Sequence, residues 1–166
     1  PAPLLLLEAC GREALERVVL RSPLLQRFVV GTHERALRSL LTPACSSIGS
    51  IAIVGGGLFP RTAIVLRRLC PDARITVIDA SRDNLDCARE RLDAGTVEFL
   101  HARYAPGRAE GFDLIVIPLS FAGDRAAVYA HPPAPLVIVH DWIWRTRGES
   151  RIVAIALMKR INLIRR

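Results

Sequence analysis

Residue types suited to ligand binding follow two short apolar runs in this sequence. Ile51–Val54 leads into three consecutive glycines, Gly55–Gly57, and Ile75–Ile78 leads into Asp79. Glycine permits positive φ angles and lets a ligand come close to the backbone. Asp79 follows the last glycine by 79 − 57 = 22 residues, a spacing at which a carboxylate can accept hydrogen bonds from both hydroxyls of a ribose. Together these features predict a nucleoside-binding site.

The positions of the glycines separate two classes of nucleoside cofactor. In the dinucleotide pattern Gly-x-Gly-x-x-Gly, the third glycine lets a helix pack closely beside the pyrophosphate. Pro60 stands at that position, and proline has no N–H to donate to a phosphate. S-adenosylmethionine carries no phosphate and needs only a close backbone approach. The pattern therefore favours S-adenosylmethionine, with a dinucleotide as the alternative.

A second reactive group follows the apolar run Val137–Val139. His140 and Asp141 place a base and an acid there, and Trp142 and Trp144 come next. The ordinary imidazole pKa of about 6.5 would let His140 accept a proton from a hydroxyl or amine acceptor. Successive residues of an extended strand face opposite ways, so Asp141 need not act with His140. We predict both as catalytic, the alternatives being a strand end or a transfer driven by proximity alone.

These residues need a scaffold that gathers strand ends. Short β-branched runs alternate with helical stretches, which predicts an α/β fold: a doubly wound, Rossmann-like, mainly parallel sheet of about five strands. Ligands bind beyond the carboxyl ends of such strands. Two helices, Glu13–Leu20 and Leu24–Leu41, are expected to precede this core and lie over the pocket. The other predicted elements are strands Ile51–Val54, Ile75–Ile78, Val97–Leu100, Leu114–Pro118 and Leu136–Val139, and helices Thr62–Leu69, Arg82–Leu92 and Asp124–Tyr129.

The chain of 166 residues is long enough to bury a core as one globular domain. We expect an N-terminal helical cap over residues 1–45 and a Rossmann-like cofactor-binding core over residues 46–166. Ile152–Ile164 fits a helix about as well as a strand, and we predict a helix capped near Ser150. That choice leaves the fifth strand at an open edge, which is a liability. We therefore expect either a trimmed chain or a partner subunit at this edge, as in a homodimer.

Composition restricts the partners. The longest apolar runs, Leu114–Leu119 and Ile152–Met158, are far shorter than the roughly 18–20 residues of a membrane-spanning helix. No export signal is legible, so we predict a cytoplasmic protein. Lys and Arg number 23 against 16 Asp and Glu, giving 23 − 16 = +7, but the arginines are scattered and aromatic residues make up only 5%. A nucleic-acid surface would concentrate both kinds of residue, so we expect no nucleic acid.

Histidines and cysteines carry weaker predictions. The four of each have no paired short spacing, so we predict no metal site. The cysteines are expected to be buried free thiols, which suits a reducing compartment. We expect His33 at the surface, with a position over the pocket as the alternative.

From Ile51 to Trp142 the chain resembles the class I S-adenosylmethionine-dependent methyltransferases. The likeness covers the glycine turn, Asp79-Ala80-Ser81, the helix Asn84–Leu92, and the runs Val97–His101 and Phe112–Pro118. The resemblance implies that the glycines lie against the methionine moiety, that Asp79 holds the ribose, and that the loop after Leu100 flanks the adenine. The implied cofactor-binding residues are Gly55, Gly56, Gly57, Asp79, Ala80, Ser81, Arg103, Tyr104 and Pro118.

Two positions depart from that family. Ile53 stands where most members carry an acidic residue that orients the cofactor's amino group, and Phe59 stands where many carry another glycine. The turn Gly55–Ile64 is similar instead to that of nicotianamine synthases, which transfer the aminocarboxypropyl group of the same cofactor.

The acceptor is read from the end of the fourth strand. Ile117–Phe121 lacks the amide or carboxylate with which enzymes that methylate nucleobase amines hold their target. We therefore expect a methyltransferase acting on an unidentified small-molecule acceptor. The alternatives are an aminocarboxypropyl transferase and a noncatalytic binding protein.

Overall fold

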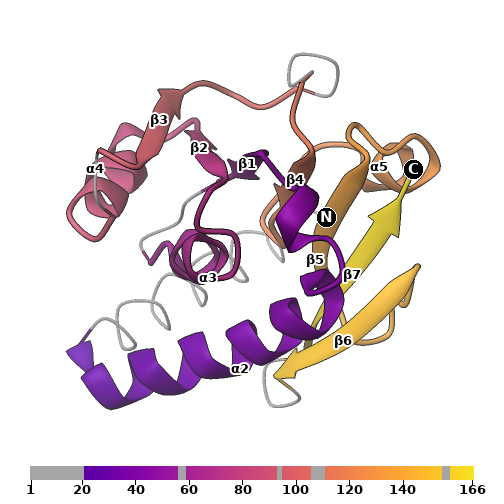
Figure 1. Ribbon diagram of the computed structural model, residues 1–166, viewed down its shortest axis with the longest axis horizontal. Coiled ribbons are helices and arrows are strands. Elements are labelled where there is room, and N and C mark those ends of the chain that lie inside the picture. Colours follow the sequence, from indigo (N-terminus) through magenta and orange to yellow (C-terminus); the bar gives the residue numbers. More distant parts are fainter. Residues whose placement is uncertain (1–20, 56–58, 93–94, 106–110, 155–157) are drawn as a thin grey trace, which may run out of the picture.

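Strands and helices alternate along the chain and form a single sheet with helices on both faces (Figure 1). The structure is a computed structural model that describes residues 21–55, 59–92, 95–105, 111–154 and 158–166. Its strands are β1 (Ser50–Val54), β2 (Arg74–Asp79), β3 (Val97–His101), β4 (Leu114–Ile117), β5 (Leu136–Trp142), β6 (Glu149–Ala154) and β7 (Lys159–Arg165). Its helices are α2 (Pro23–Leu41), α3 (Arg61–Leu69), α4 (Arg82–Arg89) and α5 (Arg125–Ala130), with a 3-10 turn at Cys45–Ser47.

The sheet has seven strands in the order β3-β2-β1-β4-β5-β7-β6. The first five are parallel, and β7 runs antiparallel to both β5 and β6. The predicted α/β class and the five parallel strands are confirmed. The predicted total of about five strands is wrong, because two more strands extend the sheet beyond β5.

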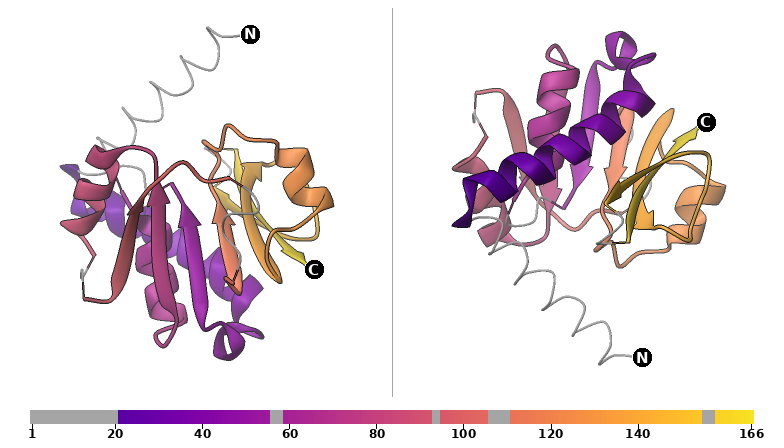
Figure 2. Two further views of the ribbon diagram at one scale, coloured as in Figure 1. Left: turned by 90° about the horizontal axis from the view of Figure 1, so that it is seen from above. Right: turned by 90° about the horizontal axis from the view of Figure 1, so that it is seen from below.

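Two apolar clusters hold the layers together. Leu37 of α2, Leu66 of α3 and Leu85 of α4 pack on one face of the sheet, while Val128 of α5 packs on the other. Figure 2 shows α2 running across the strands on its face. The central strands are buried on both faces, which is why their sequences are apolar throughout instead of alternating.

The predicted helix over Leu24–Leu41 is confirmed as α2. Ser22 caps it, because its Oγ accepts a hydrogen bond from the N–H of Leu25 at 3.4 Å, and Pro23 occupies the first turn, where its missing N–H costs nothing. The other predicted helix, Glu13–Leu20, lies outside the described residues.

The segment after β5 differs from its prediction. We expected a helix capped near Ser150, with Asn162–Arg166 leaving it, but β6 and β7 form an antiparallel hairpin there. Gly148 starts this hairpin with a φ of 57°, and a Cβ at that position would collide with the carbonyl of Leu163. Every residue of β5 pairs with β7, so the backbone groups along that edge are bonded within the chain. The expected open edge is therefore absent at β5, and it no longer argues for a homodimer.

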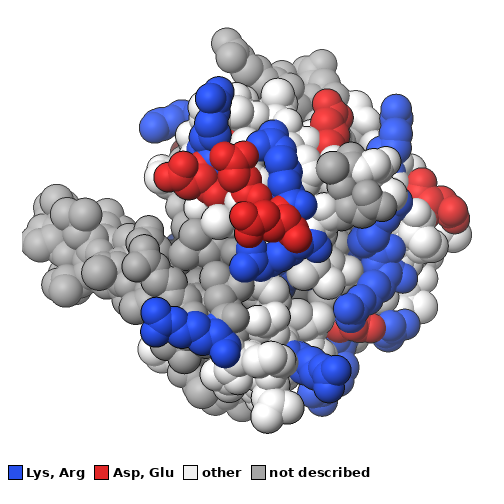
Figure 3. Space-filling view, turned by 90° about the vertical axis from the view of Figure 1, so that its left-hand side faces the viewer, with Lys and Arg blue, Asp and Glu red and all other residues white. Residues whose placement is uncertain are grey.

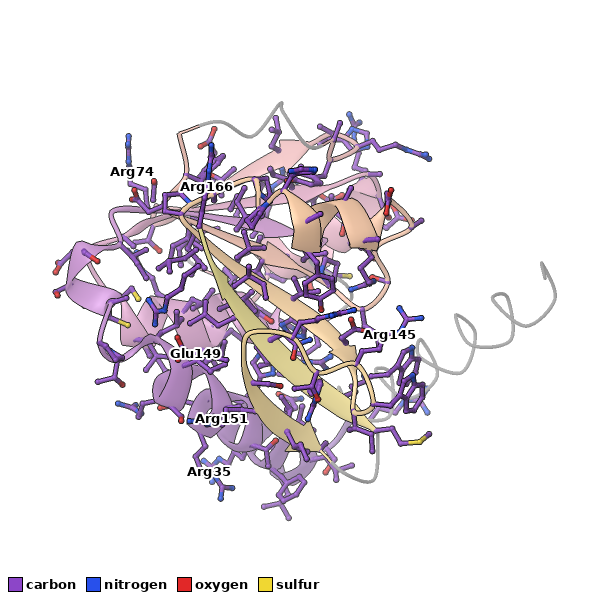
Figure 4. All side chains as sticks on the ribbon, turned by 90° about the vertical axis from the view of Figure 1, so that its right-hand side faces the viewer. Arg35, Arg74, Arg145, Glu149, Arg151 and Arg166 are labelled. Atoms are coloured by element: carbon purple, nitrogen blue, oxygen red, sulfur yellow. The ribbon has the colours of Figure 1, made fainter. Side chains whose placement is uncertain are left out.

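Charged side chains are spread over the surface. On the face that carries α4, acidic and basic groups lie side by side (Figure 3). One ion pair of α4 joins Arg89 and Asp86 at 2.6 Å. On the opposite side, Arg74 and Arg166 lie far from Arg35 and Arg151 (Figure 4). In the described part of the chain, no helix is both long and apolar enough to cross a lipid bilayer.

Candidate functional site

The predicted site residues lie in one row across the carboxyl edge of the parallel strands. Pairing of β2 with β3 sets Asp79 beside His101. Continuing the register of β1 with β2 by one residue, and with β4 by two residues, sets Gly55 between Asp79 and Pro118. The register of β4 likewise sets Pro118 beside His140. Neighbouring strands are about 4.8 Å apart, so the three steps from Asp79 to His140 span about 14 Å.

Gly55 brings the ends of three strands together. Its φ is +72°, and a Cβ there would lie 3.3 Å from Cγ of Pro118. Its N–H donates a hydrogen bond to the carbonyl of Ile78 at 2.7 Å. A side chain at this position would be strained and would fill the space beside Pro118. The other two predicted glycines, Gly56 and Gly57, lie outside the described residues.

The Asp79 carboxylate is held in place by its own chain. Asp79 is buried, its Oδ1 accepts from the N–H of Ser81 at 2.8 Å, and its Oδ2 accepts from Nδ2 of Asn84 at 3.2 Å. Ser81 caps α4 by accepting from the N–H of Asn84 at 3.3 Å. The Ala80 carbonyl lies 3.1 Å from Nε2 of His101. Each carboxylate oxygen has two lone pairs, so Asp79 can accept further hydrogen bonds from a ligand.

Arg103 and Tyr104 follow β3. Arg103 is exposed, whereas Tyr104 is half-buried against the apolar cluster that includes Ile78 and Ile117. The Tyr104 ring meets Phe121 edge-on at 6.0 Å between centroids. Its hydroxyl is enclosed and has no hydrogen-bond partner among the described residues, and burial raises the pKa of Tyr104. An enclosed hydroxyl without a partner costs free energy that a ligand group could offset.

His140 and Asp141 lie on opposite faces of β5, as the alternation of a strand requires. The His140 ring lies 5.0 Å from that of His33, on the face covered by α2. The Asp141 carboxylate accepts from the hydroxyl of Tyr129 on α5 and from the N–H of Trp142, both at 2.9 Å. The structure therefore brings His140 to His33, and it does not bring Asp141 to His140.

His33 is buried, with 2% of its surface exposed, so the expectation of a surface histidine is wrong. Its Nε2 lies 3.1 Å from Oγ1 of Thr62 at the start of α3. Burial, and then the charges of His140, Arg61 and Lys159, hold the pKa of His33 well below its ordinary value.

Nε2 of His140 is enclosed and has no hydrogen-bond partner among the described residues. Burial lowers the pKa of His140 to about 3, and the positive charges of Arg61, Lys159 and Arg125 lower it further in the same direction. The imidazole is consequently neutral at neutral pH and presents an unused ring nitrogen.

A pocket lies next to His140, between α2, the end of β5 and the hairpin. Apolar side chains that line it are Phe28, Val29, Leu119 and Val153. Residues of the lining that can carry charge or donate hydrogen bonds are Thr32, His33, Arg61, His140, Asp141, Lys159 and Arg160. The pocket thus adjoins the end of the row that is farthest from Asp79.

Arg125 fixes the rim of this pocket. Its guanidinium donates to the carbonyls of Pro118 at 2.8 Å, Leu119 at 2.9 Å and His140 at 2.9 Å. These bonds tie the carboxyl end of β4 to that of β5. A planar guanidinium with several donors suits such a clamp better than an ammonium group would.

Sequence reasoning missed Thr32 and Lys159, and it gave the position of His33 over the pocket only as the alternative to a surface histidine. Thr32 and His33 lie one turn after Phe28 and Val29, so helical spacing could have placed all four on one face. Lys159 could not be found, because its position depends on the hairpin. Among the described residues, no group of three or more His, Cys, Asp or Glu side chains could hold a metal ion.

Comparisons with known proteins address the fold. No protein-family model matches this sequence, and no curated protein sequence matches it. The mitomycin 7-O-methyltransferase MmcR matches with a TM-score of 0.57 at 18% identity, over 86% of this chain and 54% of its own. The plantazolicin methyltransferase BpumL, solved with a pentazolic desmethylPZN analogue and SAH, matches with a TM-score of 0.56 at 18% identity, over 78% and 52%.

A methyltransferase from Geobacter sulfurreducens matches with a TM-score of 0.50 at 22% identity, over 65% of this chain and 60% of its own. This chain spans about half of the length of MmcR and BpumL. The chain therefore has the fold of class I S-adenosylmethionine-dependent methyltransferases.

Proposed function

We propose that this protein is an S-adenosylmethionine-dependent methyltransferase that acts on a small-molecule acceptor. The observation that carries the proposal is the row from Asp79 to His140: a fixed carboxylate stands at one end, and at the other end a pocket is lined by His140, whose Nε2 has no hydrogen-bond partner among the described residues. The shared fold supports it, as does the SAH that BpumL binds in its solved structure.

The residues at the Asp79 end fit this cofactor. The Asp79 carboxylate would accept hydrogen bonds from the ribose hydroxyls, and Gly55 would let the cofactor approach the backbone next to Pro118. Arg103 and Tyr104 would flank the adenine, with the enclosed Tyr104 hydroxyl supplying a hydrogen bond. The N–H of Ser81 keeps the carboxylate in position, and the carbonyl of Ala80 lies against His101.

S-adenosylmethionine supplies an electrophilic methyl group on a sulfonium. His140 would act on the acceptor: its neutral Nε2 accepts a hydrogen bond from the acceptor's O–H or N–H. The acceptor's oxygen or nitrogen would bond to that methyl carbon as the carbon–sulfur bond breaks and its electron pair returns to sulfur. From a hydroxyl acceptor the proton would pass to Nε2, for which a pKa of about 3 suffices because the methylated hydroxyl is a far stronger acid. An amine acceptor would keep the proton as the methylated ammonium.

Arg125 would serve as a positioning residue, since it holds the backbone of His140 and of the β4 end at once. Alignment of acceptor, methyl group and leaving sulfur accounts for much of the rate in such transfers. Asp141 would act only indirectly, by fixing the end of β5 through Tyr129 and Trp142.

The products of the reaction test the proposal. The protein is incubated with S-adenosylmethionine and a panel of hydroxyl and amine acceptors, and the nucleoside products are separated by chromatography. Methyl transfer yields S-adenosylhomocysteine, and Asp79→Ala should reduce its formation while Asp83→Ala, an exposed acid on α4, should not. Methylthioadenosine would show aminocarboxypropyl transfer instead, and absence of both products with every acceptor would favour a noncatalytic binder.

A further inference from the structure

The charges around the pocket are of one sign. Arg61 opens α3, Lys159 opens β7, and both line the pocket. Arg160 also contributes to the lining, but it is the register partner of Asp141, so its side chain belongs to the face of the sheet opposite to His140. The acidic residue that the described lining includes, Asp141, turns its carboxylate to Tyr129 on the other face of the sheet.

The pKa values of His33 and His140 reflect this positive charge. Arg61 and Lys159 each act to lower the pKa of both His33 and His140, and Arg125 adds to the effect on His140. Among the described residues, no carboxylate acts to raise either pKa. The pocket therefore has a positive potential at its polar end, where a ligand anion would be stabilised.

The opposite side of the pocket is apolar. Phe28 and Val29 approach it from α2, Val153 from β6 and Leu119 from the loop after β4. Phe28 has 65% of its surface exposed. An occupant with an apolar body would cover this ring and gain by removing it from water.

We propose that the acceptor is a small carboxylic acid with an apolar body, whose carboxylate lies within reach of Lys159 and Arg61 and whose neutral nucleophile faces Nε2 of His140. That this ligand accepts a methyl group rests on the proposed function, but its binding through a carboxylate can be measured without turnover. Two sources could supply this carboxylate: the acceptor, or the methionine end of the cofactor. Lys159 separates the two sources, because β7 lies beyond β5, on the side away from Gly55.

A matched pair of probes tests the proposal: 4-hydroxybenzoate and its uncharged amide, 4-hydroxybenzamide. Each is titrated into protein saturated with S-adenosylhomocysteine, and binding is followed by calorimetry and by the side-chain NMR signals of His140. We expect the carboxylate to bind at least tenfold more tightly than the amide. In Lys159→Met this ratio should fall to about one or two.

Arg165→Met is the matched control. Arg165 lies six residues along the same face of β7, about 20 Å from Lys159, so its loss should leave the ratio unchanged. Equal binding of the two probes, no binding of the carboxylate, or equal effects of the two variants would overturn the proposal.

The cofactor is titrated separately. Lys159→Met should bind S-adenosylhomocysteine as the unsubstituted protein does. A loss of this affinity in Lys159→Met, without discrimination between the probes, would assign the positive end of the pocket to the cofactor's carboxylate and overturn the proposal. A carboxylate preference without methyl transfer to any acceptor would instead uphold the binding site and remove the proposed function.

Discussion

Replacing His140 by Gln should make the protein less sensitive to acid. The pKa of His140 is lowered from 6.5 to about 3 by burial and by the nearby cations. As the pH falls below 6.5, His140 is therefore protonated in the unfolded chain but stays neutral in the folded protein. The free energy of unfolding decreases until the pH reaches about 3. One pKa unit corresponds to about 1.4 kcal/mol, so His140 alone should cost about 2 kcal/mol between pH 7 and pH 5.

Urea unfolding at pH 7, 6 and 5 measures this effect. The unsubstituted protein should lose about 2 kcal/mol more free energy of unfolding over this range than His140→Gln does. His131→Gln is the control, because His131 is exposed and lies outside the pocket. Carboxylates also titrate at low pH, and the comparison removes their contribution because all three proteins share them. Parallel pH profiles for the unsubstituted protein and His140→Gln would refute the burial of a neutral imidazole.

Three further predictions concern the scaffold. Gly55→Ala should lose about 1–3 kcal/mol of unfolding free energy, because it forces a side chain to a φ of +72°. The control Gly31→Ala lies in open space on α2 and should gain about 0.5–1 kcal/mol. Urea unfolding measures both, and equal effects of the two substitutions would contradict the strain at Gly55. Arg125→Met should lower kcat about 10–100-fold through misalignment, while its affinity for S-adenosylhomocysteine stays within about twofold of the unsubstituted protein. Steady-state kinetics measure the first and calorimetry the second, and a loss of affinity as large as the loss of kcat would contradict a positioning role. Burial raises the pKa of the Cys70 thiol from 9.0 to about 12, so iodoacetamide at pH 8 should modify it on the order of 1000-fold more slowly in folded than in urea-unfolded protein; rapid labelling of the folded protein would contradict its burial.

The parallel part of the fold was predictable because its signals are local. Each central strand is a short apolar run, and the break between strand and helix is marked by residues such as Gly55 and Ser81. Burial of β1, β4 and β5 on both faces makes these runs apolar without alternation. The handedness of the crossovers then restricts which face of the sheet each connecting helix covers.

The hairpin was not predictable from its own residues. Ile161 and Leu163 alternate with the buried polar Asn162, which suits a strand, yet the same segment also fits a helix. Nδ2 of Asn162 donates to the Tyr129 hydroxyl at 2.9 Å and to the Arg145 carbonyl at 2.8 Å. Those partners are distant in sequence, so tertiary pairing decided the structure of this segment and local pattern did not.

The site was predictable in part for the same reason. Residues directly after strands, such as Asp79 and His140, follow from the rule that ligands bind at the carboxyl ends of parallel strands. His33 and Lys159 come from a helix before the sheet and a strand after it, and only the packing of α2 against the hairpin brings them to His140. Their contributions depend on distances that no sequence spacing encodes.

Calorimetric titration with S-adenosylhomocysteine and with NAD tests most directly that the row from Asp79 to His140 binds S-adenosylmethionine. S-adenosylhomocysteine should bind and NAD should not, and Asp79→Ala should weaken S-adenosylhomocysteine by about 1.5–3 kcal/mol through the loss of charge-assisted hydrogen bonds to the ribose. Binding of NAD without S-adenosylhomocysteine would contradict the account, and an unchanged affinity in Asp79→Ala would remove that carboxylate from the site.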